Sequence, residues 1–332
     1  MSDADEAVTN SAFAPGDPLP PWCEPLWDVL AARAANETLP HALLLCGPAG
    51  LGKRVLADAF VRARLCGTPE DGRACGHCRA CRLLAAGTHP DRVLVEIEEN
   101  PKTHKMRTEI VIDQIRALSA RLAMASQLNG WQVAAIDPAD AMNPAAQNAL
   151  LKTLEEPSDA SLIVLVADQP WRLSATIRSR CQRLDFAVPS ANDALAWLSA
   201  RAVEHADAML AAAGGNPGEA WLLAENGGMQ RRQGVARDLL ALAAGRGDAR
   251  AIGKAWADDQ PVQRLVQAAR LLEGAMRARA SGSRSRFDPG WGSVELERAF
   301  EHANRLRVLL NGPLRADLAL FEWLDGLSAA AR

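Results

Sequence analysis

Ala42-Leu43-Leu44-Leu45-Cys46 is followed directly by Gly47-Pro48-Ala49-Gly50-Leu51-Gly52-Lys53, and these two runs together indicate the fold. The first run is apolar throughout, as in a strand that is covered on both faces. The second run has the spacing of a loop that cradles phosphate, and a helical pattern continues from Lys53 to Leu65. In such a loop the backbone N–H groups at Gly47, Gly50 and Gly52, together with the Lys53 ammonium, face phosphate oxygens. The order strand, glycine loop, helix predicts an α/β domain of the nucleotide-binding type.

At two positions the chain lacks a residue that an ATP-hydrolysing site with such a loop normally contains. Arg54 stands where a Ser or Thr hydroxyl holds Mg²⁺. Pro138 follows Asp137 at the end of another apolar run, where an acidic residue usually positions the attacking water, and proline can act neither as an acid nor as a base. Intrinsic ATP hydrolysis is therefore not expected, and binding of ATP and Mg²⁺ at the loop should be weak or absent.

The order of elements predicts a parallel sheet wound on both faces. Apolar runs at 42–46, 92–96, 132–137 and 162–167 alternate with helical patterns at 25–35, 53–65, 113–125 and 143–157. From residue 190 onward no strand pattern returns, and helical stripes lead to the end of the chain. A Ser/Arg/Gly loop over 279–292, which contains Arg284, has no predicted role.

A group of cysteines interrupts the sheet pattern. Cys66, Cys75, Cys78 and Cys81 are separated by eight, two and two residues, a spacing that predicts a closed tetrahedral Zn²⁺ site with a structural role. The insertion shows no helix or strand pattern of its own, so bound metal should supply much of its folding free energy. Nearby arginines leave nucleic-acid contact, a solvated basic surface and a protein interface all open. Two histidines, His77 and His89, could substitute as ligands, but both are expected at the surface.

Composition sets the broad class of the chain. Of its 332 residues, 48% are hydrophobic and 23% are charged, and the net charge of −3 gives no overall reason to expect nucleic acid or an anionic membrane as the main partner. Residues 1–21 are polar and rich in proline, which predicts a disordered N-terminal segment. We find no pattern of a secretory signal or a membrane span, and clustered cysteines fit a reducing compartment. The sequence thus predicts a cytoplasmic protein without membrane contact.

Two further motifs carry a family resemblance. Ser179-Arg180-Cys181, together with Asn148-Ala149-Leu150-Leu151-Lys152-Thr153-Leu154-Glu155-Glu156-Pro157, resembles the clamp-loader branch of the AAA+ ATPases. In that family the arginine of the triplet projects into the ATP site of a neighbouring subunit, so the resemblance implies that Arg180, with Ser179 beside it, acts in trans as an arginine finger. It also implies that Gly218 replaces an arginine that senses nucleotide in ATP-hydrolysing relatives.

The resemblance implies a domain plan and partners. An AAA+ domain over 22–187, with a zinc module at 66–81, would be followed by a helical lid at 188–229 and a helical C-terminal collar at 230–332. The chain would be a non-hydrolysing subunit of a DNA polymerase holoenzyme in replication. It would assemble with motor and delta-type subunits and meet the sliding clamp and primed DNA through the complex. An active ATPase subunit of the same complex and a zinc-dependent DNA-binding module are the alternatives.

Overall fold

The computed structural model describes residues 12–14, 16–101, 103–128, 130–283, 285, 287–310 and 314–329. They form two compact units, each described here by itself. The first comprises Met1–Trp197 with Asn216–Glu219, and the second comprises Leu198–Gly215 with Ala220–Arg332. The segment 188–229, predicted as one helical lid, is therefore divided between the two units.

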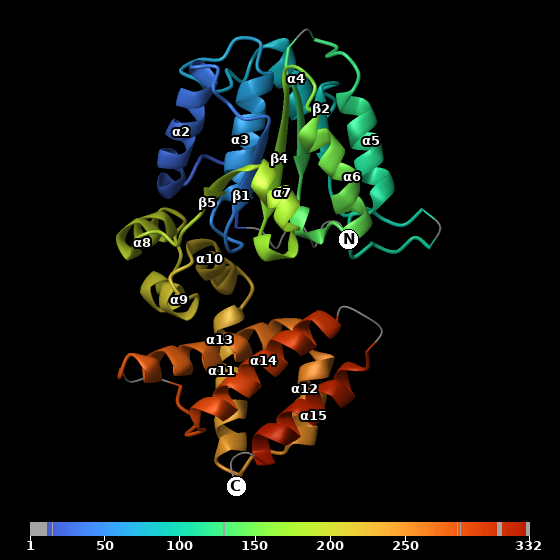
Figure 1. Cartoon of the computed structure of the whole chain (residues 1–332). Helices are drawn as coiled ribbons and strands as arrows, with labels where there is room; N and C mark the ends of the chain where they lie inside the picture. The colour runs from blue at the N-terminus through green and yellow to red at the C-terminus, as the bar shows by residue number, and fades with distance from the viewer. Residues whose placement is uncertain are drawn as a thin grey trace. The chain divides into compact units, whose positions relative to one another are not determined.

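A parallel sheet forms the centre of the first unit (Figure 1). Within the described residues it has five strands in the order β2-β3-β4-β1-β5. The strands are β1 (Ala42–Cys46), β2 (Arg92–Val95), β3 (Gln132–Ile136), β4 (Ser161–Ala167) and β5 (Gln182–Asp185). Every residue of β1, β3 and β4 is buried, because helices cover both faces of the central strands. The parallel α/β fold expected from the apolar runs is thereby confirmed.

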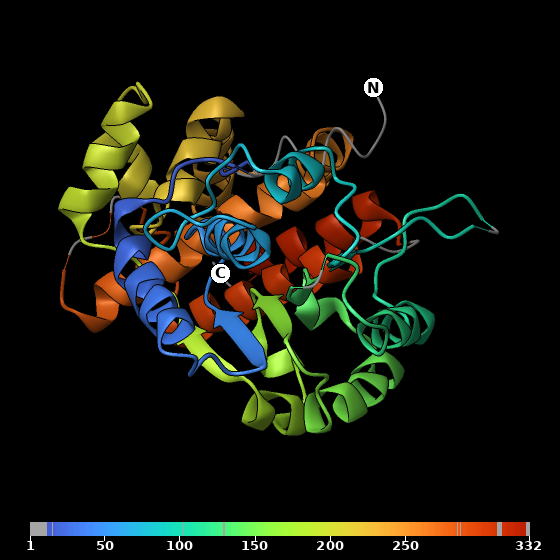
Figure 2. The ribbon, with the colours of Figure 1, turned by 90° about the horizontal axis from the view of Figure 1, so that it is seen from above.

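Helices pack on both faces of this sheet (Figure 2). The first unit contains α2 (Glu24–Ala35), α3 (Lys53–Leu65), α4 (Arg79–Ala85), α5 (Ile112–Leu122), α6 (Pro144–Glu155), α7 (Ala175–Arg180), most of α8 (Ala191–Ala200), and the short 3₁₀ turns η1 (Pro21–Cys23), η2 (Ala139–Ala141) and η3 (Pro170–Arg172). Side chains such as Leu43 and Val164 pack with α2 and α3 on one face. Leu44 and Ile163 pack with α5, α6 and α7 on the opposite face.

The strand order fixes where a ligand site can form. The chain leaves β1 through α3 on one face of the sheet, whereas it leaves β4 through α7 on the other face. In open α/β sheets such a reversal opens a crevice at the carboxyl ends of the strands. The loops that follow β1, β3 and β4 therefore meet at one edge of the sheet.

Three expectations from the sequence need correction. Strand β5 was not predicted, because Leu184 is its one buried residue and the strand lies at the sheet edge. The cysteine insertion was expected to have no regular structure, but helix α4 begins within it at Arg79. Of the segment 1–21, residues 1–11 and 15 lie outside the described part, but Ala12 and Phe13 are buried, and the Phe13 ring lies 5.1 Å from the Trp197 ring. This part of the segment is packed because it carries an aromatic anchor.

The described helices of the second unit are joined by loops, and its described residues form no named strand. Its helices are α9 (Ala206–Ala212), α10 (Pro217–Glu225, from Ala220 onward), α11 (Gly228–Ala243), α12 (Ala249–Asp258), α13 (Pro261–Ala280), α14 (Ser293–Leu309) and α15 (Ala316–Ala329). The predicted stripes are confirmed, since Leu265 and Leu272 of α13 and Leu296 of α14 are fully buried in one core. Arg284 of the predicted basic loop lies outside the described residues. Among the residues described, no helix is both long enough and apolar enough to span a membrane.

Candidate functional site

The glycine loop between β1 and α3 has the backbone shape of a phosphate-binding loop. Gly50 and Gly52 have φ angles of 78° and 86°, in the left-handed region that side chains disfavour. Gly47 passes so close to the residue that follows β5 that a Cβ there would lie 2.5 Å from the Phe186 carbonyl oxygen. Because Gly52 caps the N-terminus of α3, the loop N–H groups and the positive end of that helix lie together. The predicted loop residues are thus brought together as expected.

The Lys53 ammonium contacts the glycine loop and a nearby carboxylate. Its Nζ donates to the carbonyl oxygens of Gly47 at 2.6 Å and Pro48 at 2.5 Å, and it lies 2.7 Å from Asp168 Oδ1. The side chain is 1% exposed, and burial lowers the pKa of Lys53 while Asp168 opposes the shift. An ammonium group has three hydrogens to donate. All of them therefore have partners before any phosphate arrives.

Arg54 occupies the space between two carboxylates at the strand ends. Its Nε lies 2.8 Å from Asp137 Oδ2 and its Nη2 lies 3.2 Å from Asp168 Oδ2. Burial acts to lower the pKa of Arg54, but Asp137 and Asp168 outweigh it, so the net shift is upward. The guanidinium thus forms ion pairs with both acidic groups at this edge of the sheet.

The pKa values of the two carboxylates shift in opposite directions because their ion-pair partners differ. Burial raises the pKa of Asp137, which has Arg54 as its ion-pair partner. Burial also acts to raise the pKa of Asp168, but Arg54 and Lys53 together hold that pKa below its usual value. Asp168 was not singled out from the sequence. The available signal was an acidic residue directly after the fourth apolar run, at the same position relative to its strand as Asp137.

The segment Asn216–Glu219 packs directly on the glycine loop within the first unit. Asn216 Nδ2 donates to the Ala49 carbonyl oxygen at 2.7 Å, and Gly218 N donates to the Gly50 carbonyl oxygen at 3.2 Å. A Cβ at Gly218 would lie 2.4 Å from that same Gly50 oxygen. In this arrangement no side chain fits at position 218, where the family resemblance implied a missing arginine.

Arg180 lies at the C-terminus of α7. Ser174 caps the start of this helix by accepting from Ile177 N at 3.3 Å, and Ile177 is fully buried. The Arg180 side chain is 35% exposed; its Nη1 donates to the Thr176 carbonyl oxygen at 3.1 Å and its Nη2 lies 2.7 Å from Glu155 Oε1.

Residues close to Arg180 in the sequence have their own, separate partners. Ser179 is exposed and its Oγ donates back to the Thr176 carbonyl oxygen at 3.0 Å, which is a bond within its own helix. Arg183 lies on β5 and pairs with Asp185 at 2.7 Å. Arg180 is therefore connected to α6 through its guanidinium, whereas Arg183 is paired within its own strand.

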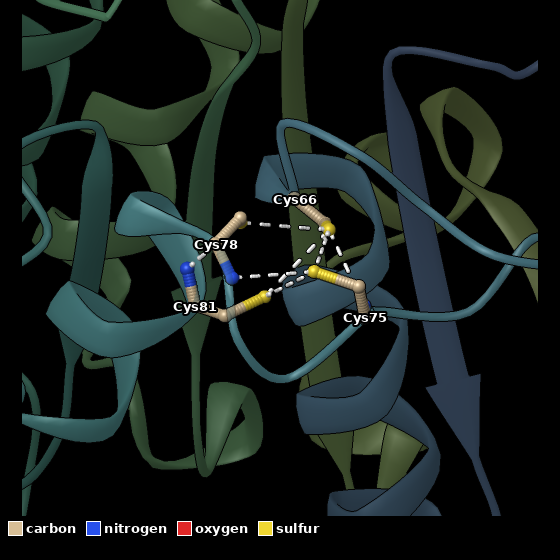
Figure 3. A group of neighbouring side chains, drawn as sticks. All are labelled: Cys66, Cys75, Cys78 and Cys81. Carbon is tan, nitrogen blue, oxygen red and sulfur yellow. Dashed lines mark hydrogen bonds between the residues drawn. The ribbon is translucent and has the colours of Figure 1, made fainter.

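The four predicted cysteines converge, and we call them the cysteine cluster (Figure 3). Their sulfur atoms all lie within 4.8 Å of one another, and separations of 3.6 to 3.9 Å join Cys66 to Cys75, Cys78 and Cys81, and Cys75 to Cys81. A disulfide needs about 2.05 Å between sulfurs. Four sulfurs about 2.3 Å from a central ion at tetrahedral angles lie about 3.8 Å apart. The cluster is thus shaped to hold a tetrahedral metal ion rather than a disulfide.

Backbone groups support these sulfurs. The N–H groups of Cys75, Cys78 and Cys81 donate to the sulfurs of Cys66, Cys75 and Cys78 respectively, each at 3.4 Å. The bond from Thr68 lowers the pKa of the Cys75 thiol to about 5, and that from Cys81 N–H lowers the pKa of Cys78. Burial raises the pKa of Cys81 to about 12. Hydrogen bonds to sulfur favour the thiolate form that metal ions require.

The module around the cluster is fastened to α2 through Arg73. This guanidinium lies 2.6 Å from Glu24 Oε2 and 4.5 Å from the centre of the Trp27 ring. Of the two candidate histidine ligands, His77 is exposed as expected, but His89 is buried, contrary to the expectation. Burial lowers the pKa of His89, whose Nδ1 accepts from Asp91 N at 3.2 Å, so the ring is part of the interior.

Comparisons with known proteins agree with one another. A family model described as "DNA polymerase III, delta subunit" matches residues 23–190. The "DNA polymerase III subunit delta'" of Pseudomonas aeruginosa is 41% identical over 241 residues, which cover 71% of this chain and 70% of that protein. The subunit of the same name from Escherichia coli is 35% identical over 260 residues, covering 77% and 76% respectively.

A gamma subunit-related protein of DNA polymerase III from Thermotoga maritima matches 92% of this chain and 99% of its own, at 17% identity and a TM-score of 0.44. The family model covers about half of the chain, and both delta' relatives are matched over more than two thirds of their length. This chain therefore belongs to the family of DNA polymerase III delta' subunits.

Proposed function

We propose that this chain is a clamp-loader subunit of DNA polymerase III that does not hydrolyse ATP and supplies Arg180 to the ATP site of a neighbouring motor subunit. In this proposal residues 22–187 are the AAA+ domain, 188–229 a lid and 230–332 a collar that joins the other subunits. The motor and delta-type subunits are its partners, and the sliding clamp and primed DNA meet it through the complex in the cytoplasm. Membership of the delta' family supports this assignment.

The observation that carries the proposal is the ion-pair network around Arg54. Hydrolysis of ATP needs Mg²⁺ to neutralise the β- and γ-phosphates, and carboxylates at the strand ends commonly hold that ion. Here Asp137 and Asp168 both form ion pairs with Arg54, and Lys53 contacts the loop carbonyl oxygens and Asp168. Nucleotide binding at Gly47, Gly50, Gly52 and Lys53 would require these contacts to break, which supports weak binding or none.

Arg180 provides a permanently charged group at the C-terminus of α7. An arginine binds phosphate oxygens through two parallel N–H groups and needs no nucleotide of its own to do so. Its side chain is partly exposed, and the exposed Ser179 precedes it, so a neighbouring subunit can approach this end of α7. Such a group stabilises the charge that develops on the transferred phosphoryl group.

We further propose that the cysteine cluster holds a structural Zn²⁺. Four thiolates with no open coordination position match the sites that stabilise folds rather than catalyse reactions. The contact of Arg73 with Glu24 and Trp27 supports a role in joining this module to α2.

The test is reconstitution of the complex with Arg180→Ala. Complex assembly should be retained, while DNA-stimulated ATP turnover at the neighbouring site should fall by roughly 10³ to 10⁵, the range seen for arginine fingers elsewhere. Arg178→Ala, at an exposed position on the same helix, is the matched control and should leave the rate unchanged. An unchanged rate with Arg180→Ala would refute the finger assignment. ATP turnover by the isolated chain that is abolished by Lys53→Ala would refute the non-hydrolysing role.

A further inference from the structure

We infer that Glu155 is a positioning residue for Arg180, an inference that rests on the proposed function of Arg180 as an arginine finger. Glu155 is the last residue of α6 and Arg180 is the last residue of α7. These helices pack against each other on the same face of the sheet (Figure 1). The two helix ends bring the carboxylate and the guanidinium into contact at 2.7 Å.

The backbone on both sides of Arg180 is fixed by burial. Ile177 is fully buried three residues before it, and Cys181 is buried directly after it. Gln182, two residues after Arg180, pairs in register with Leu43 of β1. The position of the Arg180 Cα is therefore set by the core, and what remains free is the conformation of a long side chain.

Two contacts restrict that side chain. The Thr176 carbonyl oxygen accepts from Nη1 at 3.1 Å, and Glu155 Oε1 lies 2.7 Å from Nη2. A guanidinium has five N–H donors in a rigid plane, so these two contacts set its orientation and leave three hydrogens for a phosphate. An arginine otherwise loses considerable rotamer entropy when it is held in one conformation. Glu155 reduces this loss before a neighbouring subunit arrives.

The exposure of the Glu155–Arg180 ion pair indicates that it orients the guanidinium rather than stabilises the fold. The Glu155 side chain is 50% exposed and that of Arg180 is 35% exposed, and ion pairs in such positions contribute little to folding. Glu155 should therefore be replaceable without loss of the fold. The adjacent Glu156 is also exposed and acidic, which makes it a matched control.

The experiment measures DNA-stimulated ATP hydrolysis by the reconstituted complex as a function of ATP concentration. Glu155→Ala should lower kcat at the affected site roughly tenfold, with KM little changed, because a misoriented group weakens the transition state more than substrate binding. Glu155→Gln keeps an acceptor oxygen and should restore part of the rate. Glu156→Ala should match the unmodified complex.

A double-mutant cycle separates orientation from a general structural effect. In a complex that already carries Arg180→Ala, the further change Glu155→Ala should have no effect, because Glu155 acts through that guanidinium. Equal effects of Glu155→Ala with and without Arg180, or a rate that rises when Glu155 is removed, would overturn the inference. If Arg180→Ala itself leaves the rate unchanged, it is the proposed function that fails.

Discussion

Replacing Arg54 by methionine tests whether its ion pairs maintain the phosphate loop. The substitution keeps most of the side-chain volume but leaves Asp137 without its ion-pair partner and Asp168 with Lys53 alone. Breaking a fully buried ion pair costs about 3–5 kcal/mol, whereas exposed pairs contribute about 0–1 kcal/mol. The Arg54 side chain is 38% exposed and that of Asp137 is 18% exposed, so solvent screens part of the interaction. We therefore expect a loss of about 1–2 kcal/mol.

Hydrogen exchange is the appropriate assay, because the chain contains two compact units and a single unfolding midpoint would mix them. A loss of one to two kcal/mol corresponds to exchange that is roughly 5 to 30 times faster, measured in peptides from β1 and α3. Since the cost comes from an unpaired carboxylate, adding Asp137→Asn to Arg54→Met should recover most of the protection.

The matched control is Arg183→Met, which removes an arginine from an exposed pair with Asp185 on the edge strand. Exchange in β1 and α3 should remain close to that of the unmodified chain. The reasoning fails if Arg54→Met behaves like this control, or if Asp137→Asn recovers nothing.

Three further outcomes are expected. Gly218→Ala should destabilise the first unit by about 1–3 kcal/mol in the same exchange assay, because its Cβ would meet the Gly50 oxygen, whereas Gly234→Ala, with nothing within 4 Å, should be neutral or stabilising; equal effects would contradict the packing described. Metal analysis should find one zinc ion per chain, and its removal by a chelator should increase proteolysis of the cysteine module, while His77→Ala should retain the metal; a metal-free chain with an equally resistant module would contradict the structural role. The pKa of Asp168 is held below its unfolded value of 3.8, so this carboxylate stabilises the fold above that pH and the stabilisation is lost as the pH falls through the lower folded value. Asp168→Asn should therefore flatten the acid limb of a stability-against-pH curve, and an unchanged limb would contradict the assignment.

The central part of the fold could be predicted from sequence because its signals are local. An unbroken apolar run followed by glycines at fixed spacing determined β1, the loop and the start of α3. Strand β5 gave no such signal, since an edge strand buries few side chains. Helix α4 was missed because its N-cap is the Cys78 sulfur, which accepts from Cys81 N, and a cysteine is not a usual capping residue.

Contacts within a short stretch of sequence could be predicted for the candidate site, whereas contacts between distant residues were missed. Arg54 and Asp137 were each identified from their positions, but their ion pair with each other was not. Asp168 lies 114 residues from Arg54, so their contact depends on the order of strands in the sheet. In contrast, the cysteine cluster lies within a short stretch, and its spacing alone indicated that the sulfurs would converge.

The backbone contact between Gly218 and Gly50 and the ion pairs of Arg54 limit which substitutions the glycine loop tolerates. A hydroxyl-bearing residue in place of Arg54 would leave Asp137 without its ion-pair partner and Asp168 with Lys53 alone. An arginine in place of Gly218 would bring its Cβ against the Gly50 oxygen. Each substitution is thus expected to be destabilising by itself, and neither relieves the cost of the other. Positions 54 and 218 are thus constrained independently, one by charge and the other by the space beside a backbone oxygen, so a substitution at either would need its own compensating change nearby.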